Sequence, residues 1–318
     1  MPKSYSPPPG ARSRELDARG SAAGEDAGPD DSPTTGGPRR LYQRMRATLR
    51  VTRGRLLAAD LISIATAWDM PSYVKRVTRP YRKALIGGYR GMRSALRDRL
   101  PPGAARRTDH IFDHFDLYML DHGFIRAIYP NRHRLAPDVW RSSQPAPHDI
   151  ALFVRRGIRT IVNLRGARDC GSYRLERASC QQYGIKLIDF PTKSREAPSA
   201  IFFREAGALF DCIDYPLLMH CKAGADRVGL MSVLYLILAK ACPPEQAIRK
   251  LSLRYGHIKQ ARTGVLDAVV QAYIRHASLE PVDFRKWAET HYDAQAVTAD
   301  FRSRSWANNL VDGILRRE

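Results

Sequence analysis

The sequence predicts an α/β protein with a central, mostly parallel sheet that helices flank on both faces. Buried strands are expected over 158–166 and 184–191, where β-branched and other apolar residues are bounded by Gly or Pro. A third strand, over 215–220, follows a helix expected over 201–214. Strands that alternate with helices of this length are typical of a parallel sheet covered on both sides.

The remaining elements follow from composition and from turn residues. The stretch "VWRSSQPAPHDIALFVRRG" predicts a short strand, a turn containing Pro, and a helix that ends at Gly157. The longest apolar run, 228–239, is shorter than the roughly 20 residues of a membrane span, so we expect a buried helix there. After Pro244 the pattern is helical, over 245–257, 263–277 and 284–297.

Composition divides the chain into four parts. Residues 1–37 are rich in Pro, Gly, Ser and Asp, and they predict a disordered tail. A basic helical extension is expected over 38–108, and its first helix, over 41–57, has apolar residues at helical spacing with Arg on the other turns. The catalytic domain is expected over 109–280 and a helical C-terminal extension over 281–318.

The charge of the chain predicts an anionic partner. The formal net charge is +20, and residues 38–108 alone hold 18 Lys and Arg against 3 Asp and Glu. Such a segment could lie on an anionic membrane surface, dock on the catalytic domain, or bind nucleic acid. No recognised nucleic-acid fold or stacking platform accompanies it, so we favour a helix that is packed or adjacent to a membrane.

Cysteine and histidine usage argues against structural metal and disulfides. The five cysteines include no CxxC pair, and the N-terminus has no apolar segment typical of a secretory signal. His110, His114 and His122 are spaced so that they fall on different faces of a helix. We therefore expect a cytoplasmic protein, peripheral to a membrane at most, that uses no cofactor and no metal.

The stretch "LLMHCKAGADRVGL", 217–230, carries the chemistry. A strand, a loop containing Gly, and a helix that begins near Arg227 would direct several backbone N–H groups at one point, which suits an oxyanion such as phosphate. Cys221 lies at the mouth of this cup, where the helix dipole favours the thiolate. Arg227 can fold back and bind two phosphate oxygens. The loop is suited to holding phosphate against a reactive sulfur.

These residues resemble a known family. His220, Cys221, five residues and Arg227 match the HCx5R loop of the cysteine-based protein tyrosine phosphatase superfamily, nearest its dual-specificity-like branch of bacterial and fungal proteins. The similarity covers roughly residues 109–253. It implies that Cys221 attacks phosphorus to form a phosphocysteine, that Arg227 binds the phosphoryl group, and that His220 positions the loop and helps to keep the thiol ionised.

Two departures from the family pattern concern turnover. Family members usually have Ser or Thr after the loop Arg, and this sequence has Val228. The general acid usually lies on a separate loop, where no clear equivalent is visible. Asp226, inside the loop, is the acid we favour, because some members with a similar ending use that Asp; Asp189 and Glu196 are the alternatives. The bland interpretation of Asp226 is a carboxylate that stabilises the first turn of the helix.

The substrate-binding group is expected to combine loop backbone and nearby cations. Its members are Lys222, Ala223, Gly224, Ala225, Arg165 and Arg141. The sequence thus predicts hydrolysis of phosphomonoesters of the phosphotyrosine or dual-specificity type. Phosphoinositide or inositol phosphate substrates are an alternative, because "CKAG" also opens the loop of some phosphoinositide phosphatases of this superfamily. A phosphate-binding pseudophosphatase with little turnover is the rival that Val228 suggests.

Overall fold

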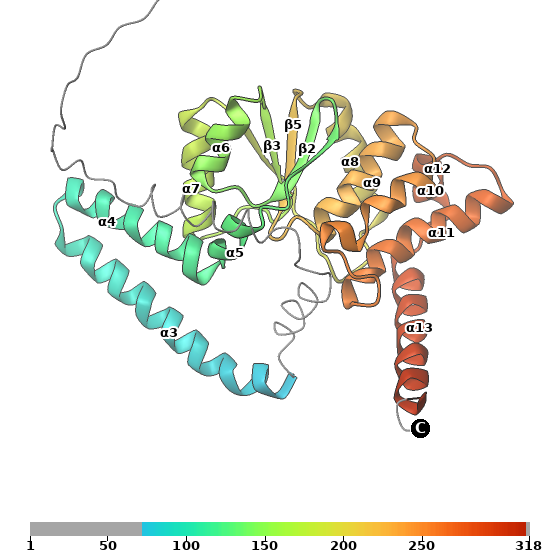
Figure 1. The fold of residues 1–318 in the computed structure, drawn as a ribbon, viewed down its shortest axis with the longest axis horizontal. Coiled ribbons are helices and arrows are strands. Elements are labelled where there is room, and N and C mark those ends of the chain that lie inside the picture. The colour runs from blue at the N-terminus through green and yellow to red at the C-terminus, as the bar shows by residue number, and fades with distance from the viewer. Residues whose placement is uncertain (1–71, 316–318) are drawn as a thin grey trace, which may run out of the picture. The chain divides into compact units, whose positions relative to one another are not determined.

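The computed structural model describes the backbone of residues 72–315 and the side chains of residues 80, 81 and 84–304 (Figure 1). All of these residues belong to one compact unit. The predicted disordered tail (1–37) and the basic helix expected over 41–57 lie outside the described residues. Within the described part, no helix combines the length and the apolarity needed to cross a membrane.

A five-stranded sheet forms the centre of the unit, in the order β1-β2-β5-β3-β4. The pairs β2–β5, β5–β3 and β3–β4 are parallel, and only β1 runs antiparallel, beside β2. The predicted mostly parallel sheet is therefore confirmed, whereas β1 was not expected from the sequence. The strands are β1 (His133–Ala136), β2 (Val139–Ser143), β3 (Thr160–Asn163), β4 (Lys186–Asp189) and β5 (Leu217–Cys221).

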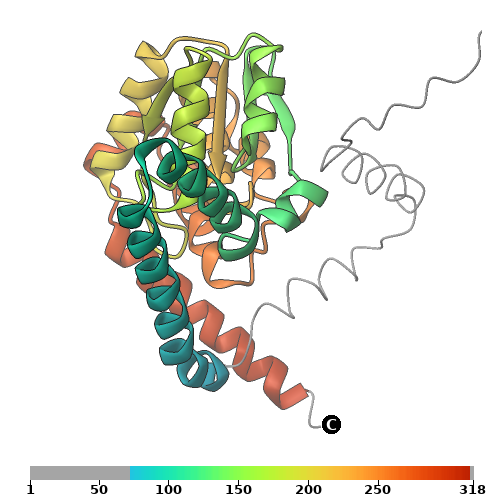
Figure 2. The same cartoon turned by 90° about the vertical axis from the view of Figure 1, so that its left-hand side faces the viewer.

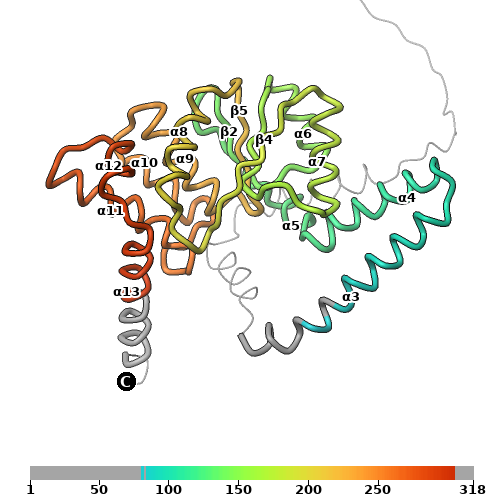
Figure 3. The backbone as a smooth tube through the Cα atoms, turned by 180° about the vertical axis from the view of Figure 1, so that it is seen from behind, coloured from blue at the N-terminus to red at the C-terminus, as the bar shows by residue number. Residues whose placement is uncertain are grey.

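Helices cover both faces of this sheet, as Figure 1 and Figure 3 show from opposite sides. The helices α6 (Pro147–Val154) and α7 (Gly171–Gln182) lie on one face, and α8 (Ala200–Cys212) and α9 (Asp226–Lys240) lie on the other. Alternation along β5 explains the two layers. Leu218 joins the core under α6, whereas Leu217 and Met219 join the larger core under α8 and α9.

The N-terminal part of the described chain packs on α7 (Figure 2). It comprises α3 (Ser72–Arg99), α4 (Pro102–Phe115), the π-helical turn η1 (Asp116–Leu120) and α5 (Gly123–Ile128). Arg93 of α3 lies 2.8 Å from a carboxylate oxygen of Asp113 in α4, and Arg174 of α7 contacts the same carboxylate at 2.8 Å. The acids of α4 thus join the basic helix to the sheet domain. The predicted boundary between residues 108 and 109 falls inside α4.

Gly171, at the start of α7, allows this close approach. A Cβ at this position would lie 2.5 Å from the carbonyl oxygen of Asp113, closer than real Cβ contacts. Any other residue at 171 would therefore push α4 away from α7.

The segment after α9 differs from the continuous helix predicted over 245–257. Only α10 (Pro244–Ala247) is α-helical, and the 3-10 turns η2 (Ile248–Lys250) and η3 (Leu253–Tyr255) follow. The carbonyls of Lys250 and Tyr255 accept hydrogen bonds from Arg141 and Asn131. A regular helix would use these carbonyls internally, so the turns free them for side chains elsewhere.

The C-terminal helices complete the larger core. After the turn η4 (Arg262–Gly264) the chain forms α11 (Val265–Leu279), α12 (Phe284–Thr290) and α13 (Ala294–Leu315). The single helix predicted over 284–297 is divided, because Asp293 accepts bonds from the backbone N–H groups of Gln295 and Ala296 and so begins a new helix. The region predicted as a helical C-terminal extension, 281–318, contains α12 and α13.

Candidate active site

The predicted strand, loop and helix are present, and they place the thiol between two parallel strands. β5 ends at Cys221, α9 begins at Asp226, and the four residues 222–225 form the loop between them. Cys221 is 3% exposed and pairs in register with Ser143 of β2. The structure therefore brings the sulfur to the carboxyl end of the central strand, where ligands bind in parallel sheets.

Every carbonyl of this loop is directed at a partner outside it. The carbonyl of Lys222 accepts from the backbone N–H of Gln144 (3.3 Å), and that of Ala223 accepts from the side-chain amide of Asn131 (3.0 Å). Arg141 Nη2 donates to the carbonyls of Gly224 (2.9 Å) and Ala225 (3.2 Å).

The outward carbonyls determine where the loop N–H groups point. In a trans peptide the C=O and the following N–H project in opposite directions, so carbonyls of 222–225 turned outward leave the N–H groups of 223–226 turned inward. In the described part of the chain, the N–H groups of 223–225 donate to no backbone carbonyl. These N–H groups form a cup beside the sulfur that can bind an oxyanion.

Gly224 is the loop residue that this conformation requires. Its φ of +73° lies in the left-handed region, and a Cβ there would lie 2.7 Å from the backbone nitrogen of Ser143. Both strain and collision therefore exclude a side chain at the third position after Cys221.

Arg141 lies behind the loop. Its side chain is 1% exposed, and besides its bonds to the loop, its Nη1 donates to the carbonyl of Lys250 at 3.0 Å. The guanidinium also lies over the ring of Tyr255, 4.3 Å from its centroid. Burial lowers the pKa of Arg141 to about 10, so it remains charged at neutral pH. This placement differs from the substrate contact expected from the sequence, because main-chain carbonyls already occupy the Nη donors.

Arg227 reaches back across the top of β3. Its Nη1 donates to the carbonyl of Leu164, directly after β3, at 3.2 Å. The sequence predicted that this side chain folds back toward the loop. In its observed position one guanidinium nitrogen is anchored, and the rest of the planar group can bind an anion in the cup.

His220 forms a buried pair that the sequence did not indicate. Its Nε2 lies 2.6 Å from Oε1 of Glu176 in α7, and both side chains are fully buried. Gln144 donates to the other carboxylate oxygen of Glu176 at 2.8 Å. The residue before Cys221 is thus fixed to α7, on the face of the sheet away from the larger core.

Asp121 contacts Arg165 and Lys222, two of the cations predicted to lie near the substrate. Arg165 contacts both of its carboxylate oxygens, at 2.5 and 2.9 Å, and Lys222 Nζ lies 3.4 Å from one of them. Burial alone would raise the pKa of Asp121, but Arg165, Arg126 and Lys222 hold it well below its usual range. Lys222 and Arg165 are brought together beside the loop, as expected. One carboxylate faces three cations, so net positive charge remains there for an anion.

The three acids considered from the sequence have different surroundings. Asp189 accepts hydrogen bonds on both oxygens, from Asn163 (2.8 Å) and from the Tyr173 hydroxyl (2.5 Å). Glu196 is exposed and paired with Lys193 at 2.6 Å. Asp226 directly follows the loop 222–225, here called the anion loop, as the first residue of α9. Its Oδ1 lies 2.7 Å from Nδ1 of His257. Of the three, Asp226 is best placed to act on a group in the cup.

Val228 is fully buried in the core between the sheet and α9, so no hydroxyl stands where the family usually has one. The next hydroxyl along α9, Ser232, donates to the carbonyl of Val228 at 2.6 Å and is one turn further from the sulfur. The helix itself offers no substitute at that position.

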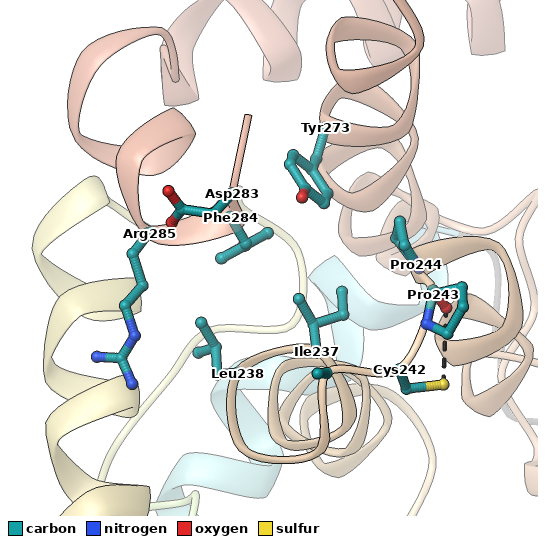
Figure 4. Close-up of a pocket in the computed structure, with 10 residues that line it drawn as sticks. Ile237, Leu238, Cys242, Pro243, Pro244, Tyr273, Asp283, Phe284 and Arg285 are labelled. Carbon is teal, nitrogen blue, oxygen red and sulfur yellow. Dashed lines mark hydrogen bonds between the residues drawn. The ribbon is translucent and has the colours of Figure 1, made fainter. Parts of the chain in front are cut away.

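Two other features of the described part lie away from the loop. A cavity of about 310 Å³ is lined by Leu238, Pro243 and Tyr273 among others, at the carboxyl end of α9 (Figure 4). The anion loop is at the amino end, about 20 Å away along the helix. His276, Glu280 and His291 place possible metal-ligand atoms within 4.8 Å of one another on α11 and after α12, and this group also lies outside the site.

Comparison with known proteins places this region in a family. A family model described as "DSP-PTPase phosphatase fused to NAD+ Kinase" matches residues 131–263. The matched residues are similar to the dual-specificity-like branch of the cysteine-based protein tyrosine phosphatase superfamily. The predicted family resemblance is confirmed. The matched region contains the loop 222–225, Arg141 and His257.

The relatives of the matched region are distant. The dual specificity protein phosphatase TpbA of Pseudomonas aeruginosa is 26% identical over 122 residues, which cover 38% of this chain and 53% of the relative. The chain thus spans about half the length of the curated relatives it matches. The crystal structure of P. aeruginosa TpbA has 20% identity and a TM-score of 0.37, covering 55% of this chain and 92% of that one. A phosphatase structure from Shewanella putrefaciens has 16% identity and a TM-score of 0.36, covering 45% and 92%.

Sequence reasoning missed the residues that support the loop. Asn131, Asp121, Glu176, His257 and Asp267 all contact the loop or its neighbours, and none was selected. A signal was present at Asp267, a single acid inside the apolar helix "VLDAVV", where an unpaired carboxylate would be costly.

Proposed function

We propose that this chain hydrolyses phosphomonoesters of the phosphotyrosine or dual-specificity type through a phosphocysteine on Cys221. The observation that carries the proposal is the loop itself, whose carbonyls are all bound from outside, so that its N–H groups turn to the opposite side. This arrangement binds a phosphoryl group and stabilises charge that develops on its oxygens.

In the first step the Cys221 thiolate attacks phosphorus, and the bond from phosphorus to the leaving oxygen breaks. Arg227 and the loop N–H groups bind the remaining phosphoryl oxygens, and Asp226 in its carboxylic form gives its proton to the leaving oxygen. In the second step water attacks phosphorus and the S–P bond breaks. Asp226 takes the proton from that water, and inorganic phosphate departs from the regenerated thiolate.

Hydrolysis of p-nitrophenyl phosphate tests this proposal. We expect vanadate-sensitive activity in the full chain and none in Cys221→Ser, which retains the size of the residue but not the nucleophile. Cys212→Ser is the matched control, because Cys212 is exposed on α8 and should leave the rate unchanged. Activity that persists in Cys221→Ser would exclude the phosphocysteine route.

A phosphate-binding pseudophosphatase is the second candidate, and Val228 supports it. Without the hydroxyl that the family usually has directly after the loop Arg, breakdown of the phosphocysteine lacks the group that would stabilise the departing thiolate from that position. This candidate predicts a burst of one p-nitrophenol per chain followed by little further release. Rapid-mixing kinetics separates the two, because sustained turnover at the burst rate contradicts the pseudophosphatase.

Phosphoinositide substrates are a third candidate, and the surface from α4 to α5 supports it. Ile111 is 69% exposed and Ile128 is 54% exposed, beside the basic helix α3 with exposed Arg90 and Arg97. Apolar and basic side chains together suit an anionic membrane, where the protein would be peripheral. Phosphate release from phosphoinositide vesicles and from phosphotyrosine peptides, compared at equal phosphate, decides between the substrates. The other large apolar residues exposed on this segment are Phe115, Met119, Leu120, Phe124 and Tyr129.

A further inference from the structure

His257 connects two carboxylates beneath the anion loop. Its side chain is fully buried in the turn after η3, its Nδ1 lies 2.7 Å from Oδ1 of Asp226, and its Nε2 contacts Oδ2 of Asp267 in α11. Gly256, which precedes it, lies close to the loop: a Cβ added to Gly256 would be 3.7 Å from the Cβ of Ala225. The three side chains form a line from α11 to the first residue of α9.

The surroundings of His257 favour the imidazolium form, in which both ring nitrogens carry a proton. Each nitrogen faces a carboxylate oxygen, and only the imidazolium form donates from both. Burial alone would lower the pKa of His257, but the bonds to Asp226 and Asp267 raise it to about 9. Two further cations act on the group: Lys259, whose Nζ lies 3.8 Å from Oδ1 of Asp267, and the buried Arg141, whose charge interacts with that of Asp226. At neutral pH the line thus consists of a cation between two acids.

Asp226 does not use its side chain to stabilise its own helix. Ala225 is the N-cap residue of α9 and offers no side-chain cap, and among the described residues no backbone N–H donates to the Asp226 carboxylate. The alternative role of Asp226, stabilising the first turn of α9, would need a hydrogen bond from a backbone N–H of that turn, and this bond is absent among the described residues. The carboxylate turns instead to His257, and 27% of the side chain remains exposed.

This geometry distinguishes the two oxygens of Asp226. Oδ1 accepts a hydrogen bond from an imidazolium, so a proton on that oxygen would meet the N–H of His257. When Asp226 is in its carboxylic form, the donor on Oδ1 therefore leaves Oδ2 as the oxygen for its proton, and no described side chain forms a hydrogen bond with Oδ2. A fixed carboxyl whose proton is on a known oxygen transfers it more readily than a rotating one.

We propose that His257 and Asp267 are positioning residues that hold Oδ1 of Asp226, and thereby present its Oδ2 as the oxygen that gives the proton to the leaving group. The proposal rests on the function proposed above and deepens it. The leaving oxygen gains the proton of Oδ2, Asp226 becomes a carboxylate, and the charge of His257 does not change. Asp267 balances that charge from the far side.

Leaving-group dependence tests the proposal, because proton donation matters most when the leaving phenol is a weak acid. His257→Gln and Asp226→Asn are compared with the unmodified chain on phenyl phosphate and on p-nitrophenyl phosphate, whose phenol is much more acidic. We expect His257→Gln to lose roughly tenfold more kcat/KM on phenyl phosphate than on p-nitrophenyl phosphate, mainly in kcat. His291→Gln, an exposed histidine after α12, is the matched control and should change neither rate.

The double variant decides whether His257 acts through Asp226. If it does, adding His257→Gln to Asp226→Asn causes no further loss. Equal losses on both substrates, or losses that multiply in the double variant, would overturn the proposal. Because Gln at a buried site can impair folding, Asp267→Asn is measured in the same way, and only variants with unchanged circular dichroism are compared.

The outcomes also separate this proposal from the proposed function. An unmodified chain that does not hydrolyse aryl phosphates, or an active Cys221→Ser, contradicts the phosphocysteine function itself. An active unmodified chain in which Asp226→Asn affects both substrates equally overturns only the assignment of Asp226 and its positioning by His257.

Discussion

Arg141 holds Gly224 from behind: its Nη2 lies 2.9 Å from the Gly224 carbonyl oxygen, in a side chain that is 1% exposed. Binding a loop carbonyl on the far side of the peptide turns the following N–H into the cup. A buried cation thus holds the loop by its carbonyls, on the side opposite its N–H groups.

Replacing Arg141 is expected to impair both stability and phosphate binding. Arg141→Met leaves the carbonyls of Lys250 and Gly224 without their donor, while that of Ala225 keeps the backbone N–H of Gly229, and loss of such buried bonds costs about 2–4 kcal/mol. Arg141→Lys should rescue little, because an ammonium cannot span three carbonyls. Urea unfolding and the protection by vanadate against thermal unfolding measure the two effects. Normal vanadate protection in a folded Arg141→Met would contradict the supporting role.

Gly224→Ala is expected to inactivate the site. A Cβ at Gly224 meets the Ser143 nitrogen at 2.7 Å in a left-handed conformation, so the loop must move. Gly157→Ala is the matched control, since Gly157 has a similar φ of +77° but nothing within 4 Å of the added carbon. Both variants should lose about 1 kcal/mol from backbone strain, and only Gly224→Ala should lose p-nitrophenyl phosphate hydrolysis. Equal activity in the two would mean that the loop tolerates the side chain.

Val228→Thr is expected to raise steady-state turnover. Thr is nearly the same size as Val and adds the hydroxyl that the family usually has, at a stability cost of about 1–2 kcal/mol for a buried polar group. The burst should retain its rate while the following steady phase becomes faster. Val233→Thr, fully buried in the same helix, controls for the stability cost alone. A steady phase that does not change would show that phosphocysteine breakdown is not limiting.

The stability of the fold is expected to fall as pH rises toward the pKa of His257. Its folded pKa of about 9 exceeds the ordinary histidine value of 6.5, so its contribution is fully present below 6.5 and is lost as pH rises through about 9. Over this range we expect a loss of at most roughly 3 kcal/mol. Urea unfolding at a series of pH values, compared between the unmodified chain and His257→Gln, isolates the contribution of His257 to the free energy of unfolding. An identical pH dependence in the two would contradict it.

Local patterns predicted the sheet well, because β5, β3 and β4 are short apolar runs with Gly or Pro beside them, and Cys221 and Arg227 are adjacent in sequence to the loop they serve. The partners of the loop could not be predicted in this way. Asn131 and His257 reach it from 92 and 31 residues away, and nothing in the local sequence shows which polar residue faces a given carbonyl.

The error over 245–257 has the same origin. The apolar residues there do have helical spacing. However, the carbonyls of Lys250 and Tyr255 accept hydrogen bonds from Arg141 and Asn131, and these tertiary bonds outweigh the local preference for helix. Arg141 was expected at the substrate because strand ends should converge there, and only its burial and its bonds to the loop carbonyls show that it supports the loop.

The 3-10 turns after α9 set a minimum length for any active fragment. They lie more than twenty residues beyond Arg227, yet their carbonyls and His257 are tied to the loop, and His257 in turn is tied to Asp267. The family match ends at residue 263, just before Asp267. A fragment trimmed to the end of this match would therefore retain every residue of the HCx5R signature and lose Asp267, the partner of His257. In this chain a fragment that keeps the contacts of His257 must therefore extend beyond the family match, into the first residues of α11.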